Sequence, residues 1–553
     1  MNRTKPYGYL VILMWALFVS LPVCSQAAQS PTAPVLTVAT SGTTVTLSWN
    51  AVSGATGYTL FYAPYPYAGP ETIGSIDMRV QTGISVKLWE GAVFYVAVQA
   101  YNSAGNSPYS NIGYFFIQAS IIPDTTDGVY IWADQLQTYN DGQNQFVAGH
   151  FVGSQKLTKD RIDAIRAYNA GFIVLQYHKA YGVDIGNNIV GPYEWGPDIA
   201  TMNEFVASNP GYGDLENYYI HWTNQKDAAH RVQHYWAGNL EYHLADIRNA
   251  GFRAYLIQKM IKRCKEVGFN GTFFDVAFFP WYEYEPDYDP SVGFGGNGMM
   301  WYEYAPWNWP SIDHDASTLA QNWNSLAVPY WQEITSGYHS GETKYYSIVN
   351  CDRMVTGWYE HVYLDHVDGG LSEGWMTGGD SNDRLVGSDW GLSASRILRY
   401  LTGNDKILIA QPNNGWSDNI ALREWWIGNY FLLKNDKSFY NYAYSMDVYW
   451  WPEYEIDLGA FMQTPTKNLG DLLVTGTQSL YARTYENGLV LVNPGESSQQ
   501  YALEGTYYRY SFSGGGYVTE NTKPAMSIEH STPMSGTVSI QPHTVLILWK
   551  PTG

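Results

Sequence analysis

A helix, then a glycine, then a short apolar strand recurs through the middle of this chain, and no other feature constrains the fold as strongly. In the first copy, "DRIDAIRAYNAGFIVLQYHK" (160–179), Ile162 and Ile165 lie at helical spacing, Gly171 ends the helix, and the strand "FIVLQYH" follows. Further copies occupy residues 255–278, 318–352 and 393–416. Strands that alternate with helices indicate parallel strands joined by crossover helices.

The spacing predicts eight strands, which are "GVYIWAD", "FIVLQYH", "YYIHW" (218–222), "GTFFDVA", "YYSIVN", "GGLSEGW", "KILIAQP" and "SFYNYAY". Eight such strands favour an α/β fold, a (β/α)8 TIM barrel with long loops, over residues 124–472. A doubly wound open sheet is the alternative, but no glycine-rich phosphate loop follows the first strand.

The two flanking segments are predicted to be all-β. In residues 31–118, apolar and polar residues alternate between Gly and Ser turns, and Trp49, Tyr58 and Tyr95 resemble the pattern of a fibronectin type III sandwich. Residues 473–553 contain the hairpin signal Asn487-Gly488 and are predicted to form a small β-sandwich.

The first 28 residues have the pattern of an export signal. Arg3 and Lys5 precede an apolar core too short to span a bilayer, and cleavage is expected after Ala27 or Ala28. The mature chain is then expected to be secreted or extracytoplasmic, without a membrane span, and compatible with association with a cell surface or an extracellular matrix. Lipidation at Cys24 is an alternative that Val23 disfavours.

The composition excludes several functional classes. A formal net charge of −20 argues against nucleic acid as a partner, because the phosphate backbone requires a basic face. The histidines are scattered without a metal-ligand motif, so we expect no metal and no cofactor. No GxSxG nucleophile motif occurs. Cys264 and Cys351 are predicted to be buried free thiols.

Two carboxylates stand out because their surroundings match. "NGTFFD" (270–275) and "DGGLSE" (368–373) each begin with Asn or Asp followed by Gly, and each carries an acid five residues after that first position. Both come at the ends of predicted strands, the fourth and the sixth, so Asp275 and Glu373 are expected at the same height on the rim of the barrel. Side chains leaning inward would bring them within the range used in glycoside hydrolysis. We therefore predict Asp275 and Glu373 as the catalytic pair.

Other polar and aromatic residues follow the predicted strands. Trp281 opens an aromatic loop, 280–310, long enough to be functional, and its indole could stack on a sugar. Asp352 is an alternative acid. The predicted substrate-binding residues are Asp134, His178, Trp281, Asn350, Asp352, Gln411, Asn413 and Trp416.

The motifs "GFNGTFFDV", "DGGLSEGW", "WPEYEIDLG" (451–459) and "ARTYENGLVLVNP" (482–494) resemble a bacterial glycosyl-hydrolase-like (β/α)8 family, of the glycosyl-hydrolase-like family fifteen type. The resemblance spans about residues 125 to 550 and implies a reaction class without a substrate. It also implies that Asp275 is the nucleophile and Glu373 the acid/base, as in the layout of α-glycosidase barrels, which have an Asp-Gly where this chain has Asn270-Gly271. The expected function is that of a secreted glycoside hydrolase that cleaves glycosidic bonds in a polysaccharide or glycoconjugate, with retention favoured over inversion, a choice that depends on the distance between the two carboxyl groups. A catalytically inactive carbohydrate-binding or surface-assembly protein is the alternative.

Overall fold

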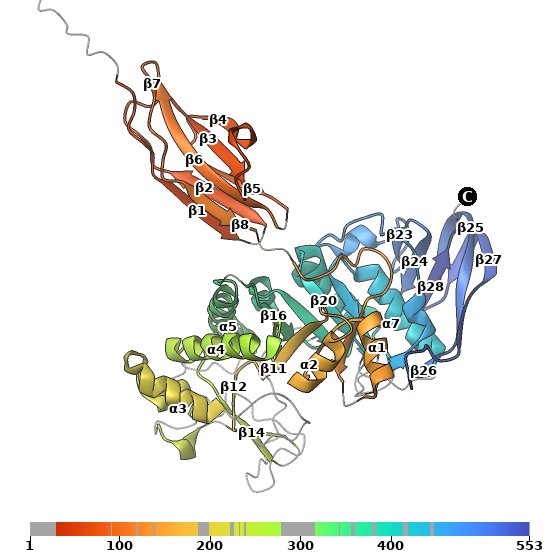
Figure 1. Cartoon of the computed structure of the whole chain (residues 1–553). Coiled ribbons are helices and arrows are strands. Elements are labelled where there is room, and N and C mark those ends of the chain that lie inside the picture. Colours follow the sequence, from red (N-terminus) through yellow and green to blue (C-terminus); the bar gives the residue numbers. More distant parts are fainter. Residues whose placement is uncertain are drawn as a thin grey trace, which may run out of the picture. The chain divides into compact units, whose positions relative to one another are not determined.

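The computed structural model of this chain divides into two compact units, Met1–Ser120 and Ile121–Gly553 (Figure 1). The predicted signal sequence, residues 1–28, lies outside the described residues. The structure describes residues 29–41, 43–89, 91–117, 120–136, 139–185, 198–221, 226–231, 233–236, 239–277, 316–341, 343–355, 360–378, 383–412, 419–442 and 447–551.

The N-terminal unit consists of two antiparallel sheets around one apolar core. The first sheet contains β1 (Leu36–Ser41), β2 (Thr44–Trp49) and β5 (Gly83–Lys87). The second contains β4 (Gly74–Arg79), β3 (Gly57–Pro64), β6 (Val93–Asn102) and β7 (Gly105–Asn106), with β8 (Gly113–Phe116) paired to β6. Alternate side chains such as Leu47, Trp49 and Val98 are buried between the sheets. The unit is all-β as predicted, and its finer assignment as a fibronectin type III module stays a prediction.

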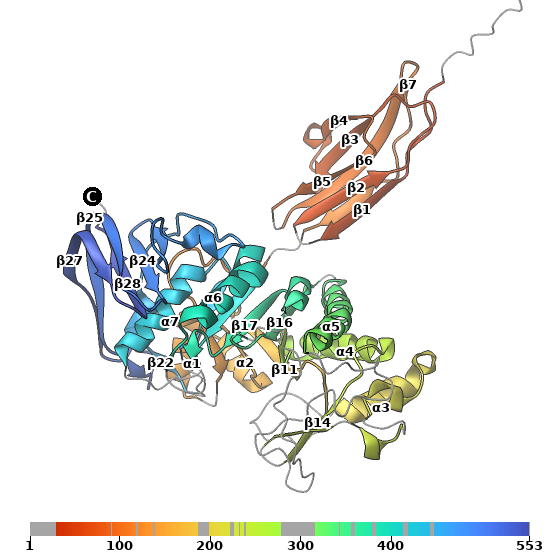
Figure 2. The ribbon, with the colours of Figure 1, turned by 180° about the vertical axis from the view of Figure 1, so that it is seen from behind.

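Eight parallel strands close into a barrel in the second unit (Figures 1 and 2). In order around the barrel they are β9 (Ile131–Gln135), β10 (Phe151–Gln155), β11 (Ile173–Lys179), β15 (Gly271–Asp275), β16 (Tyr346–Asn350), β17 (Gly369–Glu373), β20 (Ile407–Gln411) and β21 (Ser438–Tyr440). Tyr440 of β21 pairs with Ile131 of β9 and completes the ring. The predicted barrel is therefore present, and the open-sheet alternative is excluded.

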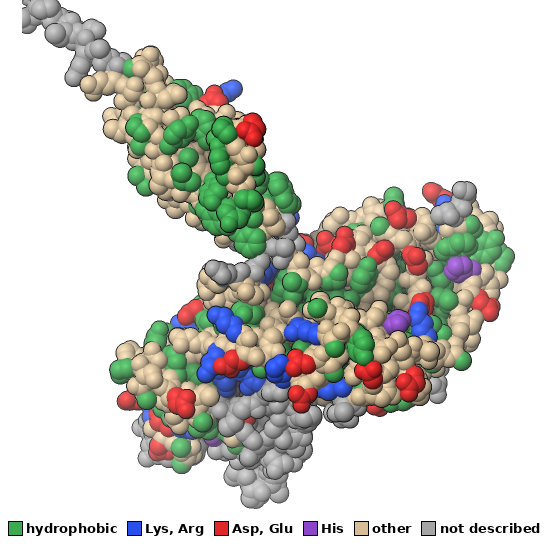
Figure 3. Space-filling model, in the orientation of Figure 1, with side chains coloured by type: hydrophobic (Ala, Val, Ile, Leu, Met, Phe, Trp, Pro, Cys, Tyr) green, Lys and Arg blue, Asp and Glu red, His purple; other side chains and the backbone are tan. Residues whose placement is uncertain are grey.

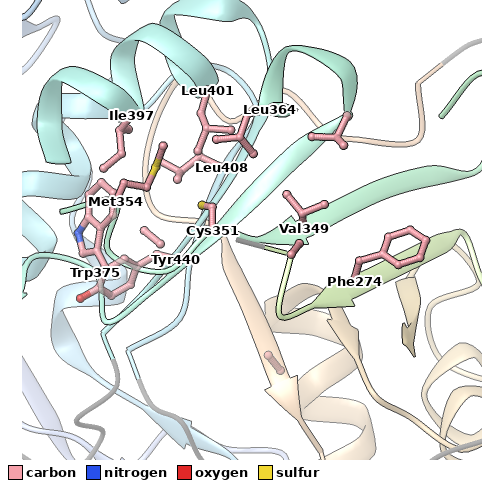
Figure 4. Close-up of a cluster of buried hydrophobic side chains, with 14 of the residues drawn as sticks. Phe274, Val349, Cys351, Met354, Leu364, Trp375, Ile397, Leu401, Leu408 and Tyr440 are labelled. Atoms are coloured by element: carbon pink, nitrogen blue, oxygen red, sulfur yellow. The ribbon is translucent and has the colours of Figure 1, made fainter. Parts of the chain in front are cut away.

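Helices surround the barrel and bury its outer face (Figures 1 and 2). They include α1 (Asp141–His150), α2 (Lys159–Arg166), α4 (Ala250–Arg263), α5 (Ala316–Tyr338), α6 (Gly387–Arg396) and α7 (Ile420–Leu433). Figure 4 shows part of this layer, where Val349 and Leu408 from the strands pack with Leu364, Ile397 and Leu401 from the surrounding helical segments. Both Cys264 and Cys351 are buried free thiols, as predicted.

One predicted barrel strand is wrong. The segment 218–222 lies in an insertion between β11 and α4, where Tyr219 and His221 form only isolated bridges. That insertion also holds α3 (Asp198–Ser208) and a small sheet of β12 (Gly182–Asp184), β14 (Asn239–Leu244) and β13 (Gln233–Trp236). The barrel uses β10 instead, whose sequence "FVGSQ" lacks an apolar run. Its central residue is Gly153, because a side chain there would collide with the Trp132 ring inside the barrel.

The C-terminal segment packs on the barrel as one antiparallel sheet of five strands. The order is β23 (Tyr481–Tyr485), β24 (Gly488–Asn493), β28 (Thr544–Trp549), β25 (Gln499–Gly514) and β27 (Met526–Ile540), and the predicted turn joins β23 to β24. One face contacts α7, where Val545 lies against Gly428. The other face buries Leu491 of β24 with Leu503 of β25 and Ile540 of β27. The sheet thus has its own core, but it is one continuous sheet rather than two stacked ones.

Among the described helices, none combines the length and the apolar character that crossing a bilayer requires.

We predict that Gly153→Ala destabilises the barrel by about 1–3 kcal/mol, because a Cβ there would lie 2.5 Å from the Trp132 ring and 2.6 Å from the Ile173 carbonyl oxygen. The measurement is thermal and urea unfolding of the full chain. The matched control is Gly149→Ala on α1, where a Cβ meets no atom within 4 Å and where alanine favours the helix. Equal stability of the two variants would contradict the proposed packing.

Candidate active site

The interior of the barrel changes from apolar to polar at the carboxyl ends of its strands. Five large side chains from different strands belong to one buried interior cluster: Trp132, Phe273, Ile348, Leu371 and Ile409. Two positions further along the same strands are Asp134, Asp275, Asn350, Glu373 and Gln411. Because side chains alternate between the faces of a strand, these polar groups face the interior at the end where (β/α)8 enzymes carry their active sites.

Asn350 connects the two predicted catalytic carboxylates. Its Nδ2 donates to Asp275 Oδ1 at 2.9 Å and to Glu373 Oε2 at 2.6 Å. Its Oδ1 accepts the backbone N–H of Asp352 at 3.0 Å. Since that oxygen is fixed by an N–H donor, the amide can present only its NH₂ group to the carboxylates.

The shared donor limits how far apart the carboxylates can be. Asp275 Oδ1 and Glu373 Oε2 can be separated by at most the sum of their distances to Asn350 Nδ2, or about 5.5 Å. The carboxyl groups of retaining glycosidases are about 5–5.5 Å apart, whereas inverting enzymes need about 6.5–9.5 Å to admit a water. The bound applies to the two oxygens that share the Asn350 donor, and it is compatible with the shorter class.

Asp275 is surrounded by groups that favour its ionised form. The Tyr177 hydroxyl donates to Oδ2, the Val276 backbone N–H donates to Oδ1 at 2.9 Å, and Lys179 Nζ lies 3.6 Å from Oδ2. Burial by itself would raise the pKa of Asp275. The charges of Lys179 and Lys156 and the hydrogen bonds from Tyr177 and Asn350 outweigh burial and hold this pKa well below its usual range.

Glu373 is in the opposite electrostatic situation. Burial raises the pKa of its carboxyl, and the negative charge of Asp275 raises it further, while Lys156 and the Asn350 hydrogen bond oppose the change only in part. The pKa values of the two acids that share one amide donor are therefore driven apart, and Asp275 loses its proton at a lower pH than Glu373.

A second charged group lies on the neighbouring strands. Asp134, which is 1% exposed, accepts a hydrogen bond of 2.6 Å from Gln155 Nε2 and lies 3.0 Å from Lys156 Nζ. Lys156 also lies over the Tyr177 ring, 5.1 Å from its centroid. On the other side of β9, Asn441, which follows β21, donates through Nδ2 to Gln411 Oε1 at 3.3 Å. Asp134 and Gln411 are thus fixed on the interior face, and their predicted role in substrate binding stays a prediction.

His178 is not brought into this cluster. It lies between Tyr177 and Lys179 on β11, so its side chain points to the other face, where its ring centroid is 6.4 Å from that of Phe274. Its Nδ1 donates to the Lys179 carbonyl oxygen at 2.7 Å. Burial and the charge of Lys259 lower its pKa to about 3, so the ring is neutral. A substrate contact for His178 has no support from this placement.

Of the other predicted residues, Asp352 lies on the turn after β16, and the remaining three lie outside the described residues. Asp352 lies on that turn with a positive φ of 52°, and its carboxylate is 3.8 Å from Arg353. Its backbone, not its side chain, is what contacts Asn350. Trp281, Asn413 and Trp416 lie outside the described residues, as does the whole aromatic loop 280–310.

Five described residues whose side chains contact Asp134 or Asp275 were not predicted, namely Gln135, Gln155, Lys156, Tyr177 and Lys179. The signal for Tyr177 was available, because it follows Ile173 and Leu175 at the period of two that marks one face of a strand. Gln155 is the last residue of β10 and Lys156 follows it, and β10 is the strand that the sequence pattern did not predict.

Strained backbone occurs directly after these strands. Lys156, Val276, Asp352 and Met376 all have positive φ, between 48° and 62°. Such φ values are unusual for residues other than glycine, and for β-branched Val276 they are an outlier that costs on the order of 1–3 kcal/mol. At Val276 this conformation accompanies the backbone N–H hydrogen bond to Asp275. Strain is therefore concentrated at the carboxylate cluster.

Comparisons with known proteins do not assign this chain. No protein-family profile and no curated protein matches it. Among solved structures, a cycloisomaltooligosaccharide glucanotransferase of Paenibacillus sp. is similar at 14% identity over 94% of this chain and 70% of that chain, with a TM-score of 0.30. The fn3 domain of human collagen alpha-1(XX) matches 18% of this chain at 23% identity, covers 94% of that chain and has a TM-score of 0.15. Scores this low establish neither a fold nor an activity.

We predict that Tyr177→Phe raises the pKa of Asp275 toward its ordinary value, because the variant loses one donor to the ionised carboxylate. Carbon-13 NMR titration of the aspartate carboxyl carbons measures this shift without requiring activity. Tyr255→Phe, which removes a hydroxyl bonded to Thr201 on another side of the unit, is the control. An Asp275 pKa that is the same in the parent and in Tyr177→Phe would show that the hydroxyl does not act on this carboxylate.

Proposed function

We propose that this chain is a secreted glycoside hydrolase that cleaves glycosidic bonds in a polysaccharide or glycoconjugate with retention of configuration. The observation that carries the proposal is the Asn350 amide bridging Asp275 and Glu373 at the interior rim of the barrel. Secretion is supported by the sequence pattern of residues 1–28.

The different protonation states supply the two roles that this reaction needs. Ionised Asp275 attacks the anomeric carbon, and the bond from that carbon to the leaving oxygen breaks as Glu373 transfers its proton to that oxygen. The product of this step is a glycosyl ester of Asp275. Glu373, now ionised, then takes a proton from water, the water oxygen bonds to the anomeric carbon, and the ester bond to Asp275 breaks.

The surrounding groups stabilise this division of roles. Lys179 and the Tyr177 hydroxyl keep Asp275 ionised before the attack, and Lys156 forms an ion pair with Asp134. Asp134, Gln411 and Asn441 place carboxylate and amide groups on the same interior rim, where they could accept or donate hydrogen bonds to sugar hydroxyls. Among the described residues, no group of three or more His, Cys, Asp or Glu side chains could hold a metal ion.

We expect Asp275→Asn to lower kcat by at least about 10³-fold, because the amide cannot form the ester, while ligand binding is retained. Glu373→Gln should lower kcat/KM by about 10²–10⁴-fold on natural substrates and much less on aryl glycosides, whose leaving group needs no proton, while hydrolysis of the ester, which needs Glu373 as a base, is slowed with both. Hydrolysis of a polysaccharide panel followed by assays of these variants measures both effects.

The matched control is Asp365→Asn, an exposed carboxylate in the helical turn Val362–His366 that precedes β17, at the opposite end of that strand from Glu373. Its kcat should equal that of the parent. If Asp275→Asn also behaved like the parent, the chain would be a carbohydrate-binding protein without catalysis, and the proposal would be wrong.

The pKa shifts predict a broad pH range of activity. Activity requires ionised Asp275, so it falls only when the pH drops through a pKa that is lower than usual, and it requires protonated Glu373, so it falls when the pH rises through a pKa that is higher than usual. Because the two acids interact, the acidic and alkaline limbs of the pH profile report pKa values of the coupled pair and not of either residue alone. In Glu373→Gln, assayed with an aryl glycoside, the alkaline limb should disappear. If the alkaline limb persisted in Glu373→Gln, the proton donated to the leaving group would come from a residue other than Glu373, and this assignment would be wrong.

A further inference from the structure

The outer face of the second sheet of the N-terminal unit carries aromatic side chains where solvent-facing strands usually carry polar ones. Leu60, Val96 and Phe115 point into the core of the unit. Their chain neighbours Phe61 on β3, Tyr95 on β6 and Tyr114 on β8 therefore point outward. An antiparallel sheet with one solvated face normally alternates apolar and polar residues, so this second apolar face departs from the usual pattern.

These rings contact each other across the sheet. Tyr65 lies 5.7 Å from both Tyr95 and Tyr114, the Tyr95 and Tyr114 centroids are 5.6 Å apart, and Phe61 is 5.2 Å from Tyr109. We call this group, together with Tyr67, the aromatic face. About half of the surface of Tyr65, Tyr67, Tyr109 and Tyr114 is exposed. Hydrophobic side chains gathered on this unit are visible in Figure 3.

The aromatic face borders a hollow of about 510 Å³. Residues from β3, β6 and their flanking loops line it, including Phe61, Tyr67, Ile73, Tyr95, Tyr109 and Ile112, and none of the lining residues is charged. Its volume lies within the range of about 300–1,000 Å³ that is typical of small-molecule sites.

The fold of the unit does not require these residues. Its core lies on the other side of the sheet, around Leu47, Trp49 and Val98, and Ile112 at the edge of the hollow is 72% exposed. Large exposed apolar patches are uncommon on soluble proteins and usually mark a binding surface. The aromatic face therefore has the character of a ligand site.

The chemistry of the hollow selects among ligands. A nucleic acid, an anionic lipid surface or an acidic polymer would need lysine or arginine side chains, and the lining of the hollow contains none. Tyrosine presents an apolar ring with a polar hydroxyl at its edge. An uncharged sugar ring is complementary to it, because it has apolar C–H faces and hydroxyls at its rim.

We infer that the aromatic face binds an uncharged polysaccharide chain. This inference rests in part on the proposed function, because the bound polymer would then belong to the class that the barrel cleaves. The occupant is recognised by its neutrality and its alternating apolar and hydroxyl surfaces, which match the hollow without any charged contact.

The experiment uses the full chain carrying Asp275→Asn, so that the polymer is not degraded, and measures binding to cellulose, chitin and starch granules by sedimentation. The test variant is Tyr67→Ala/Tyr109→Ala, which removes two half-exposed rings from the hollow. The control is Trp89→Ala, an exposed aromatic residue of the same unit that does not line the hollow. Unchanged thermal unfolding shows that each variant folds.

We expect the Asp275→Asn chain to bind at least one of the three polymers, the double variant to bind at least tenfold more weakly, and Trp89→Ala to bind like its parent. Absence of binding to all three polymers, or equal binding by the double variant and the control, would overturn the inference. A dimer in light scattering that the double variant abolishes would also overturn it, since a second copy would then be the occupant. Turnover of short soluble glycosides, measured with Asp275 intact, tests the proposed function separately.

Discussion

One side-chain amide, that of Asn350, holds two buried carboxylates together, and the chemistry proposed for this chain depends on it. Without a shared donor, Asp275 and Glu373 would repel each other in a site where both are buried. The amide lies on β16, between the strands that carry the two acids, and the Asp352 N–H fixes which end of the amide faces them. A main-chain hydrogen bond thus determines the geometry of the pair.

The barrel supplies the surroundings that make the two acids different. Large apolar side chains fill the interior of the barrel beneath the carboxylates. The dielectric constant there is low, so the charges of the carboxylates are poorly screened. Lys179 and Tyr177 come from β11, which pairs directly with the strand of Asp275, and both act on that acid. At Glu373 burial and the charge of Asp275 both raise the pKa, and Lys156 opposes them only in part. The order of strands around the barrel therefore determines which acid keeps the proton.

The sequence predicts the barrel and the acidic pair because both depend on strong local patterns. Asp275 and Glu373 end apolar strands with similar flanks, and the two-residue period of a strand then fixes their direction. The strand β10 escapes prediction because it is short, polar and contains Gly153, whose role is to admit a ring from a neighbouring strand. His178 was predicted to line the site, but its side chain points toward the surrounding helices. Successive residues of β11 point to opposite faces, so Tyr177 and Lys179 face the interior and His178 does not. The direct contact of Asn350 with both acids depends on a spacing between strands that no linear pattern encodes.

Proton NMR recorded while the chain cleaves a polysaccharide that it hydrolyses gives the anomeric configuration of the first product, and this configuration shows whether Asp275 is the nucleophile. We predict that the first product keeps the configuration of the substrate, because Asp275 then attacks the anomeric carbon directly while the hydrogen bonds of Asn350 hold Glu373 close to it. A first product of inverted configuration would contradict it, because Asp275 could not then be the nucleophile.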